Sequence, residues 1–251
     1  MTPNILFERN ARMDFQDKVA VVTGGARGIG KAIADAFMAR GAHVCTIDLL
    51  ENDFFVGDLA GEHALEAFAA KVLARYGKID YLINNAMLSK GGLNACSYED
   101  FNYALRVGAA APYYLAKLFS SSFHPGGAIV NISSTRFLMS QPNTESYTAA
   151  KGAITSLTHA LAVTLSGRVR VNAVAPGWID TANSELSSAD RLQQPVGHVG
   201  TPEDIANAVL FLCGEKSAFI TGQVLPVDGG MTKLMVYHGD EGWSLNPPSD
   251  R

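Results

Sequence analysis

The sequence predicts a single α/β domain built on a doubly wound parallel sheet, and two observations lead to this. Short apolar runs such as VAVV alternate along the chain with longer stretches whose apolar residues recur every three to four positions. No linker, composition shift or internal repeat divides the 251 residues, which is within the range of one large α/β unit. Strands alternating with helices form a parallel sheet that is covered on both faces.

The first half of the chain contains four expected strands and two expected helices. The run KVAVVTGG ends in glycines, and the helical pattern that follows it stops at Gly41. HALEAFAAKVLARYG is a second amphipathic pattern, closed by Gly77, and it leads into the buried strand IDYLINNA. The strands are therefore expected at 18–25, Val44–Ile47, 53–59 and 79–86, and the helices at 28–40 and 63–77.

The second half continues the alternation. Ser97 is a helix cap with acids in the first turn, and we expect one helix from there to about Phe123. Thr201 caps another helix, with Pro202 at its first position. The remaining elements are expected strands at 126–134, 169–177 and 222–230, and a long helix at 147–166.

Composition limits the classes of function. The net charge of −4 and the pI near 5.8 give no reason to expect nucleic acid or an anionic membrane as a partner. Residues 1–16 lack a signal-peptide core, and no run of about 20 apolar residues could cross a bilayer. Cys45, Cys96 and Cys213 lack metal-ligand spacing, which indicates reduced thiols and no metal site. We expect a soluble, cytoplasmic protein.

A glycine-rich turn, TGGARGIG, lies directly between the first strand and the first helix. Gly24, Gly28 and Gly30 permit a tight turn and let a pyrophosphate approach the free N–H groups of the helix. The alternative is a glycine-rich connection that binds nothing. The strand on one side and the helix on the other favour a dinucleotide site.

Asp48 ends the second strand and bears on the choice of cofactor. A carboxylate there can accept hydrogen bonds from both hydroxyls of an adenosine ribose and would repel a 2′-phosphate, which favours NAD over NADP. Arg27 inside the turn argues the other way, since its guanidinium could attract that phosphate. Asp58 and Leu59, after the third strand, could meet the adenine, or Asp58 could be a plain turn or cap residue.

Tyr147 and Lys151 are four residues apart and would share one face of a helix. An ammonium beside a phenol favours the phenolate and lowers the pKa of the tyrosine. Ser134 could hold a substrate oxygen while Tyr147 moves its proton. From spacing alone, a half-buried ring beside a solvated charge is the competing interpretation.

With these motifs in order, together with INNA, NISS, YTAAK, VNAVAPGWIDT and VDGG, the chain resembles the classical short-chain dehydrogenase/reductase family over about residues 17–231. The resemblance implies a Rossmann-type fold with about seven strands and a nicotinamide cofactor. It implies that Tyr147 is the catalytic acid/base, that Lys151 lowers its pKa and holds the nicotinamide ribose, and that Ser134 binds the substrate oxygen. Ser133 is then the structural neighbour.

The resemblance also assigns the cofactor site. Asn84, Asn85 and Ala86 correspond to the motif that supports the sheet and lines the adenosine side. The loop after the sixth strand corresponds to the one that meets the nicotinamide and the pyrophosphate. The expected cofactor-binding residues are Gly24, Arg27, Gly28, Ile29, Gly30, Asp48, Asp58, Leu59, Asn85, Ala86, Tyr147, Lys151, Pro176, Gly177, Ile179 and Thr181.

The chain departs from the family pattern in three places. Gly108 stands where the family has a catalytic asparagine, and we expect a helix break there to present the Gly108 carbonyl to a proton relay, because Pro112 cannot donate to it. The alternative is a lost relay. Met87 replaces a glycine and either crowds the cofactor or lines the substrate pocket. The nine residues between Asp48 and Asp58 are too few for a crossover helix. The adenine end then has less surface with which to build a 2′-phosphate site, which again favours NAD.

These observations lead to one leading hypothesis, an NAD(H)-dependent oxidoreductase that interconverts a small or polar secondary alcohol and its ketone. The short segment 182–200 favours a small substrate, and Met87, Arg136 and Trp178 are candidate pocket residues. The alternatives are an NADP(H)-dependent carbonyl reductase and a catalytically weak NAD-binding sensor or scaffold. We expect residues 1–16 to be an N-terminal extension, 17–231 the catalytic domain, and 232–251 a tail whose aromatic residues dock on a neighbouring subunit of a homotetramer or homodimer.

Overall fold

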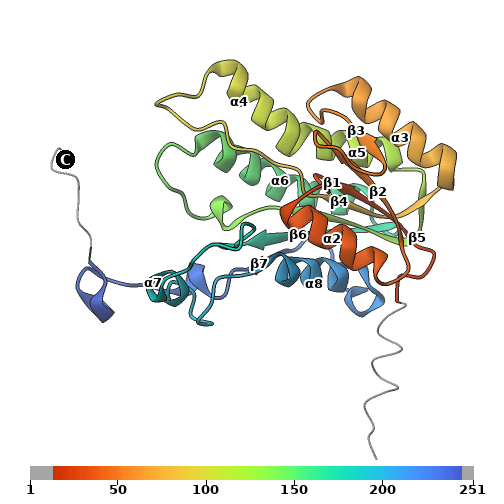
Figure 1. The fold of residues 1–251 in the computed structure, drawn as a ribbon. Coiled ribbons are helices and arrows are strands. Elements are labelled where there is room, and N and C mark those ends of the chain that lie inside the picture. The colour runs from red at the N-terminus through yellow and green to blue at the C-terminus, as the bar shows by residue number, and fades with distance from the viewer. Residues whose placement is uncertain (1–13, 245–251) are drawn as a thin grey trace, which may run out of the picture.

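The computed structural model describes residues 14–244, and in them seven parallel strands form one sheet in the order β3-β2-β1-β4-β5-β6-β7 (Figure 1). The predicted doubly wound architecture is therefore confirmed. The order reverses between β1 and β4, which creates the crevice where α/β sheets bind ligands. The strands are β1 (Val19–Thr23), β2 (His43–Asp48), β3 (Phe55–Val56), β4 (Ile79–Asn84), β5 (Phe123–Ile132), β6 (Val169–Pro176) and β7 (Val224–Val227).

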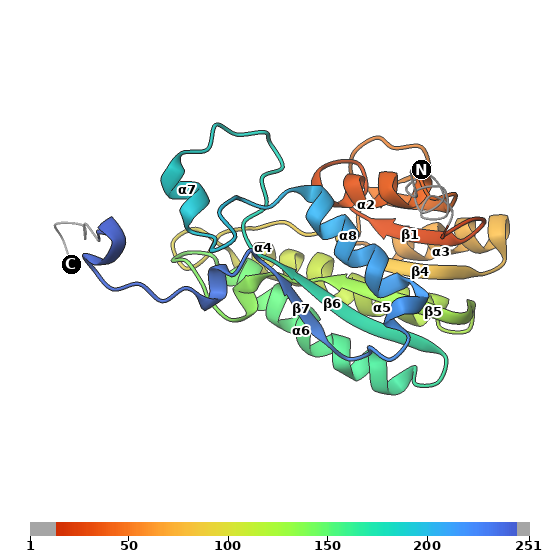
Figure 2. The same ribbon diagram turned by 90° about the horizontal axis from the view of Figure 1, so that it is seen from below.

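Helices cover both faces of the sheet. In Figures 1 and 2, α2 and α8 lie on one face, and α3, α4, α5 and α6 lie on the other. The fully buried strands β1 and β4 are near-continuous apolar runs, as a sheet covered on both sides requires. The helices are α2 (Gly28–Met38), α3 (Glu62–Tyr76), α4 (Tyr98–Leu105), α5 (Ala111–Phe119), α6 (Glu145–Thr164), α7 (Ser188–Leu192) and α8 (Pro202–Cys213).

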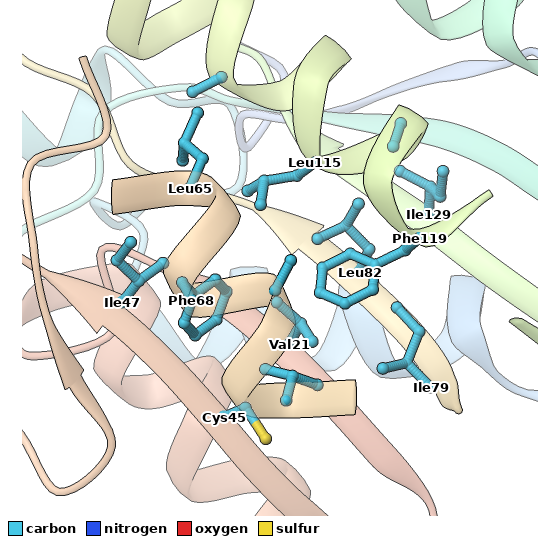
Figure 3. Packing of buried hydrophobic residues seen from close by; sticks show 14 of the residues in the cluster. Val21, Cys45, Ile47, Leu65, Phe68, Ile79, Leu82, Leu115, Phe119 and Ile129 are labelled. Atoms are coloured by element: carbon cyan, nitrogen blue, oxygen red, sulfur yellow. The ribbon is translucent and has the colours of Figure 1, made fainter. Parts of the chain in front are cut away.

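Each face has its own apolar core. Figure 3 shows Phe68 from α3 and Phe119 from α5 packed over Val21 and Leu82 of the central strands. All four of these side chains are fully buried. Complete burial of one such side chain stabilises the fold by about 1.5–3 kcal/mol, so these contacts fix α3 and α5 on the sheet.

The helix expected from Ser97 to about Phe123 is broken at Gly108, as predicted, because residues Arg106–Ala110 form a π-helical turn between α4 and α5. Its expected end was wrong, since α5 ends at Phe119 and β5 already begins at Phe123. A proline inside a helix removes one backbone donor, and Pro112 follows directly on the π turn, in the first turn of α5.

The connection between β2 and β3 has no helix, as its length predicted. Residues 49–54 close it, and the Asn52 side chain organises the turn: its Oδ1 accepts hydrogen bonds from the N–H groups of Phe54 (3.0 Å) and Phe55 (2.9 Å). The third strand is much shorter than expected, because after Val56 the chain turns towards α3. Asp48 pairs with Val56 in register at the end of β2.

At the amino end, the packed domain reaches further than the expected boundary at residue 17. Phe15 is 5% exposed and makes edge-to-face contacts with Phe37 and Tyr81, at ring-centroid distances of 5.1 and 5.5 Å. The folded unit therefore includes Phe15, and the rest of the expected extension, residues 1–13, lies outside the described residues.

At the carboxyl end, the chain leaves the body of the domain after β7 (Figures 1 and 2). Met235 and Tyr237 are 76% and 67% exposed. Within residues 14–244, no helix combines the length and the apolarity that crossing a membrane would need.

Candidate active site

The glycine turn joins β1 to α2 at the carboxyl edge of the sheet. Gly24 and Gly28 have φ values of +66° and +55°, a backbone conformation that favours glycine. At Gly30 a β-carbon would lie only 2.0 Å from the Gly24 carbonyl oxygen. These positions need glycine for the shape of the turn itself.

The turn also leaves the amino end of α2 open. Arg27 occupies the cap position without a side-chain cap hydrogen bond, and the first turn carries no acid. The first N–H groups of a helix have no partner within the helix, and here no described side chain of the chain caps them. This is the cradle that a pyrophosphate requires, so the residues present fit a dinucleotide.

Asp48 lies beside this turn, at the end of β2. Its carboxylate accepts hydrogen bonds from the N–H groups of Ala26 and Leu50, both at 3.0 Å, and it is partly exposed. The Arg27 side chain is exposed and makes no ion pair with any described residue. Both groups that bear on NAD against NADP therefore lie at the same turn.

Asp58 and Leu59 have packing and turn roles in the structure. Asp58 Oδ1 accepts hydrogen bonds from Ala60 N–H (2.8 Å) and from the Tyr103 hydroxyl (3.1 Å). Leu59 is 5% exposed and belongs to the core. The contact of this pair with adenine remains a prediction.

The loop after β4 is fastened to the glycine turn. Asn85 Nδ2 donates to the carbonyl oxygens of Thr23 and Gly24, both at 3.0 Å, and the N–H groups of Asn85 and Ala86 donate to Thr23 Oγ1. Thr23 is thus a supporting residue that the sequence interpretation missed, although it opens the TGG motif.

The loop after β6 reaches the same place. The Thr181 methyl group lies 3.5 Å from the position that a β-carbon at Gly28 would take. Gly177 is held to β7 by a hydrogen bond from its N–H to the Val227 carbonyl (3.0 Å), and Ile179 forms a bridge with Gly200. Two segments that are far apart in sequence, the glycine turn and the loop after β6, therefore come together at the carboxyl edge of the sheet.

Ser134 and Tyr147 meet beyond the end of β5. Ser134 is 7% exposed, follows the strand and caps the short helical turn Thr135–Phe137. Its hydroxyl faces Tyr147, which projects from the first turn of α6, and partly offsets the rise that burial causes in the pKa of the phenol. The neighbouring Ser133 instead anchors α6 through the Lys151 carbonyl (3.2 Å) and the Thr155 hydroxyl (2.6 Å).

Lys151 lies one turn after Tyr147 and is 4% exposed. Its Nζ donates to the Ile132 carbonyl (2.6 Å) and lies 5.5 Å from the centre of the Tyr147 ring. Burial lowers the pKa of Lys151 to about 7, because the ammonium loses its hydration. The three expected catalytic side chains are therefore together in space.

We expected Lys151 to lower the pKa of Tyr147, and the surrounding groups of the protein do not lower it. Burial raises the pKa of Tyr147 above its ordinary value, while the hydrogen bond with Ser134 and the charge of Arg136 act in the opposite direction. The physical reason is that Tyr147 is itself desolvated, while the Lys151 ammonium donates one of its N–H groups to the Ile132 carbonyl.

Gly108 and Met87, two of the departures from the family pattern, are in contact. Gly108 is buried in the π turn, and a β-carbon there would lie 2.5 Å from Met87 Sδ and 2.8 Å from Ala150 Cβ. The thioether of Met87 therefore occupies space that a side chain at residue 108 would need. Ala150 directly precedes Lys151, so this contact borders the catalytic helix.

The two other candidate pocket residues lie in different places. Arg136 belongs to the turn after Ser134 and donates to Thr144 Oγ1 (3.2 Å) and to Gln141 Oε1. Trp178 lines a small cavity of about 210 Å³ with Val196, His198 and Asp228, on the β7 side of the loop.

A buried polar network links the central strands to the catalytic helix. Asn84 Nδ2 donates to Asn131 Oδ1 (2.8 Å), and Asn131 Nδ2 donates to Thr158 Oγ1 of α6 (2.9 Å). The network holds α6 in register with β5. Thr158 was missed, because no motif surrounds it.

A cavity of about 1150 Å³ lies at the amino ends of the strands, on the far edge from these residues. Phe15, Gly127, Arg168 and Lys216 are among its lining residues. It contains none of the catalytic positions. The described residues also contain no group of three or more His, Cys, Asp or Glu side chains arranged for a metal ion.

Known proteins share both the sequence and this arrangement. A family model described as enoyl-(acyl carrier protein) reductase matches residues 24–232. An uncharacterized oxidoreductase of Thermotoga maritima is 37% identical over 88% of this chain and 98% of its own. A 3-oxoacyl-(acyl-carrier-protein) reductase, FabG, of Chlamydia muridarum is also 37% identical, over 86% of this chain and 97% of its own.

Solved structures agree. An apo SCOR enzyme from Clostridium thermocellum superposes with a TM-score of 0.87 at 43% identity, covering 92% of this chain and 99% of that one. A blue fluorescent protein from a metagenomic library, in complex with NADPH, has a TM-score of 0.81 at 28% identity, with coverages of 87% and 99%. Among the sequence relatives, a cis-4-hydroxycyclohexanecarboxylate dehydrogenase of Sinomonas cyclohexanicum is 33% identical over 88% of this chain and 98% of its own.

Similarity of this extent, in sequence and in three dimensions, covers the glycine turn and the catalytic helix alike. The chain belongs to the short-chain dehydrogenase/reductase family of oxidoreductases, which act on CH–OH groups with NAD or NADP.

Proposed function

We propose that this protein is an NAD(H)-dependent oxidoreductase that interconverts a small or polar secondary alcohol and its ketone. The observation that carries the proposal is the meeting of Ser134, Tyr147 and the buried Lys151 at the sheet edge where the glycine turn opens. When bound, the nicotinamide supplies an acceptor or donor for the hydride. The protein supplies the proton and holds the substrate oxygen.

The roles of the residues follow from their contacts. The Ser134 hydroxyl holds the substrate oxygen beside Tyr147. In reduction the Tyr147 hydroxyl gives its proton to that oxygen, and in oxidation its phenolate takes the proton back. Lys151 provides a buried donor one turn away. Pro112 has no N–H group and cannot donate a helical hydrogen bond to the Gly108 carbonyl. That carbonyl serves as the acceptor that continues the proton path.

The preference for a small substrate is supported by the segment 182–200. Its only helix in the described structure, α7, has no buried residue, and Leu192 in it is 65% exposed. This segment offers no broad apolar wall for a steroid or a long acyl chain.

The function is tested by following the nicotinamide absorbance with purified protein and a panel of secondary alcohols with NAD⁺ and of ketones with NADH. We expect turnover of at least one alcohol–ketone pair in both directions. Binding of NAD without turnover of any member would instead favour the sensor or scaffold, the alternative that the Gly108 replacement leaves open.

NAD specificity depends on Asp48, and the expected result is a higher kcat/KM with NAD⁺ than with NADP⁺. Close like charges across a binding site cost several kcal/mol, so Asp48→Asn should lower the NAD/NADP ratio about 10- to 100-fold. Asparagine retains an acceptor oxygen for one of the two N–H groups, of Ala26 and Leu50, that Asp48 now accepts from.

The matched control for this test is Asp35→Asn, which removes the same charge from the exposed Lys31 pair on α2 and should leave the ratio unchanged. An NADP⁺ preference in the unmodified protein would show that the exposed Arg27, and not Asp48, sets the cofactor preference. It would also favour the NADP(H)-dependent carbonyl reductase, a possibility supported by the NADPH-bound structural relative.

We further propose a cytoplasmic homotetramer or homodimer whose carboxyl-terminal tail docks on a neighbouring subunit. The exposed side chains of Leu234, Met235 and Tyr237, on a segment that leaves the domain, support this docking. Ending the chain after Lys233 should therefore reduce the number of subunits per particle measured by sedimentation equilibrium. An unchanged number of subunits with unchanged activity would refute the role of the tail.

A further inference from the structure

Arg136 is placed between the two parts of the catalytic centre. It lies two residues after Ser134, and its own N–H donates to Ser134 Oγ (3.2 Å). Its guanidinium donates to Thr144, which caps α6 immediately before the turn that carries Tyr147. The side chain therefore extends from the serine turn to the start of the catalytic helix.

The charge of Arg136 has no acidic partner in the described part of the chain. Arg136 is half-buried, and its two side-chain hydrogen bonds go to a threonine hydroxyl and an amide oxygen. None of the ion pairs among residues 14–244 includes it. Glu145, the nearest acid along the sequence, accepts a hydrogen bond from Leu93 N–H instead (3.3 Å).

A guanidinium has five N–H donors in a planar fork, and two hydrogen bonds leave three of them available. A half-buried cation without a counter-charge is costly unless an anion reaches it. A carboxylate presents two coplanar oxygens that match the fork in a bidentate pair.

We propose that Arg136 binds a carboxylate of the substrate, so that the enzyme acts on hydroxy acids and their oxo acids. This rests on the proposed function. With NAD⁺ bound, the carbinol carbon would give up its hydride to the nicotinamide and the hydroxyl would give up its proton to the Tyr147 phenolate, so that the C–O bond becomes a carbonyl; the carboxylate is unchanged. By binding the carboxylate, Arg136 orients the substrate with that end away from the nicotinamide.

The experiment uses a series of linear hydroxy acids with the carboxylate one to four carbons from the carbinol, each paired with its uncharged amide. We expect at least one acid to exceed its amide in kcat/KM by about 10- to 100-fold, the size of a charge-assisted hydrogen-bonded pair. Arg136→Gln should raise KM for that acid by a similar factor relative to its amide, so that the acid-to-amide ratio of kcat/KM falls to near one. Arg136→Lys should retain part of the preference, since it keeps the charge without the fork.

Arg168→Gln is the matched control, because Arg168 donates to the Ser120 carbonyl at the far edge of the sheet. Equal kcat/KM for every acid and its amide, or an equal loss on both in Arg136→Gln, would overturn the proposal. If neutral secondary alcohols are turned over while the acids gain nothing, the proposed function stands and this inference fails.

A second measurement covers the case in which no compound is turned over, which would contradict the proposed function. Binding of each acid and amide is then followed by tryptophan fluorescence in the presence of NAD⁺. Tighter binding of an acid that is lost in Arg136→Gln supports the carboxylate site. Binding that is equal for acid and amide, or absent, overturns it.

Discussion

Tyr147→Phe is expected to lower kcat about 10³- to 10⁴-fold in both directions, the upper part of the range for a general acid–base group. The change removes one hydroxyl and keeps the ring, which lies 5.5 Å from the Lys151 ammonium. NAD binding should fall much less than kcat, since Tyr147 is one of many expected cofactor contacts and the glycine turn does not involve the phenol. Steady-state rates and a nucleotide titration measure the two effects separately.

The control is Tyr113→Phe, which removes the same hydroxyl from an exposed side chain of α5 and should not alter kcat. A Tyr147→Phe enzyme that retained kcat within tenfold of the unmodified protein would show that another group moves the proton.

The pH dependence has a sign that follows from the burial of Tyr147. Its pKa lies above the ordinary value, so the phenol is protonated through neutral pH. Reduction needs the protonated form and should be fast at neutral pH and slow at alkaline pH. Oxidation needs the phenolate and should accelerate as the pH rises towards the pKa of the phenol. Tyr147→Phe should remove both slopes.

The second large effect concerns the contact between Gly108 and Met87. Gly108→Asn should destabilise the protein by at least about 2 kcal/mol, because overpacking costs about 1–3 kcal/mol and a buried unpaired amide about 1–3 kcal/mol. The new β-carbon would meet Met87 Sδ and Ala150 Cβ. Since Ala150 precedes Lys151, kcat should fall as well.

A double-mutant cycle with Met87→Ala separates the partners of this contact. Removing the thioether makes room for the asparagine, so the double variant should be more stable than additivity predicts, by about 0.5–3 kcal/mol in urea unfolding. Met38→Ala, at an exposed position on α2, is the control that should add without coupling. Additive effects for Met87→Ala and Gly108→Asn would show that the two replacements are independent.

Periodicity and turn chemistry predicted the fold well where burial is uniform. β1 and β4 are apolar runs buried on both faces, and the alternation with helices led directly to the seven-stranded sheet. The break at Gly108 was expected from the glycine and Pro112, and a π turn lies there. The expected end of this helix near Phe123 was wrong, because α5 ends at Phe119 and β5 begins at Phe123. Periodicity registers which face is buried and does not show where a buried helix gives way to a buried strand.

In the candidate site, too, some features could be predicted from the sequence and others could not. The sequence by itself determined the glycine turn, Asp48 and the Tyr147–Lys151 spacing, because these are local arrangements within one turn, one strand end and one helix face. Tertiary structure decided what depends on distant neighbours. It directed Lys151 to the Ile132 carbonyl, raised the Tyr147 pKa through burial, placed Met87 against Gly108, and left Arg136 without an acid. Desolvation and charge pairing arise from the surroundings that the whole fold assembles, and spacing along the chain does not contain them.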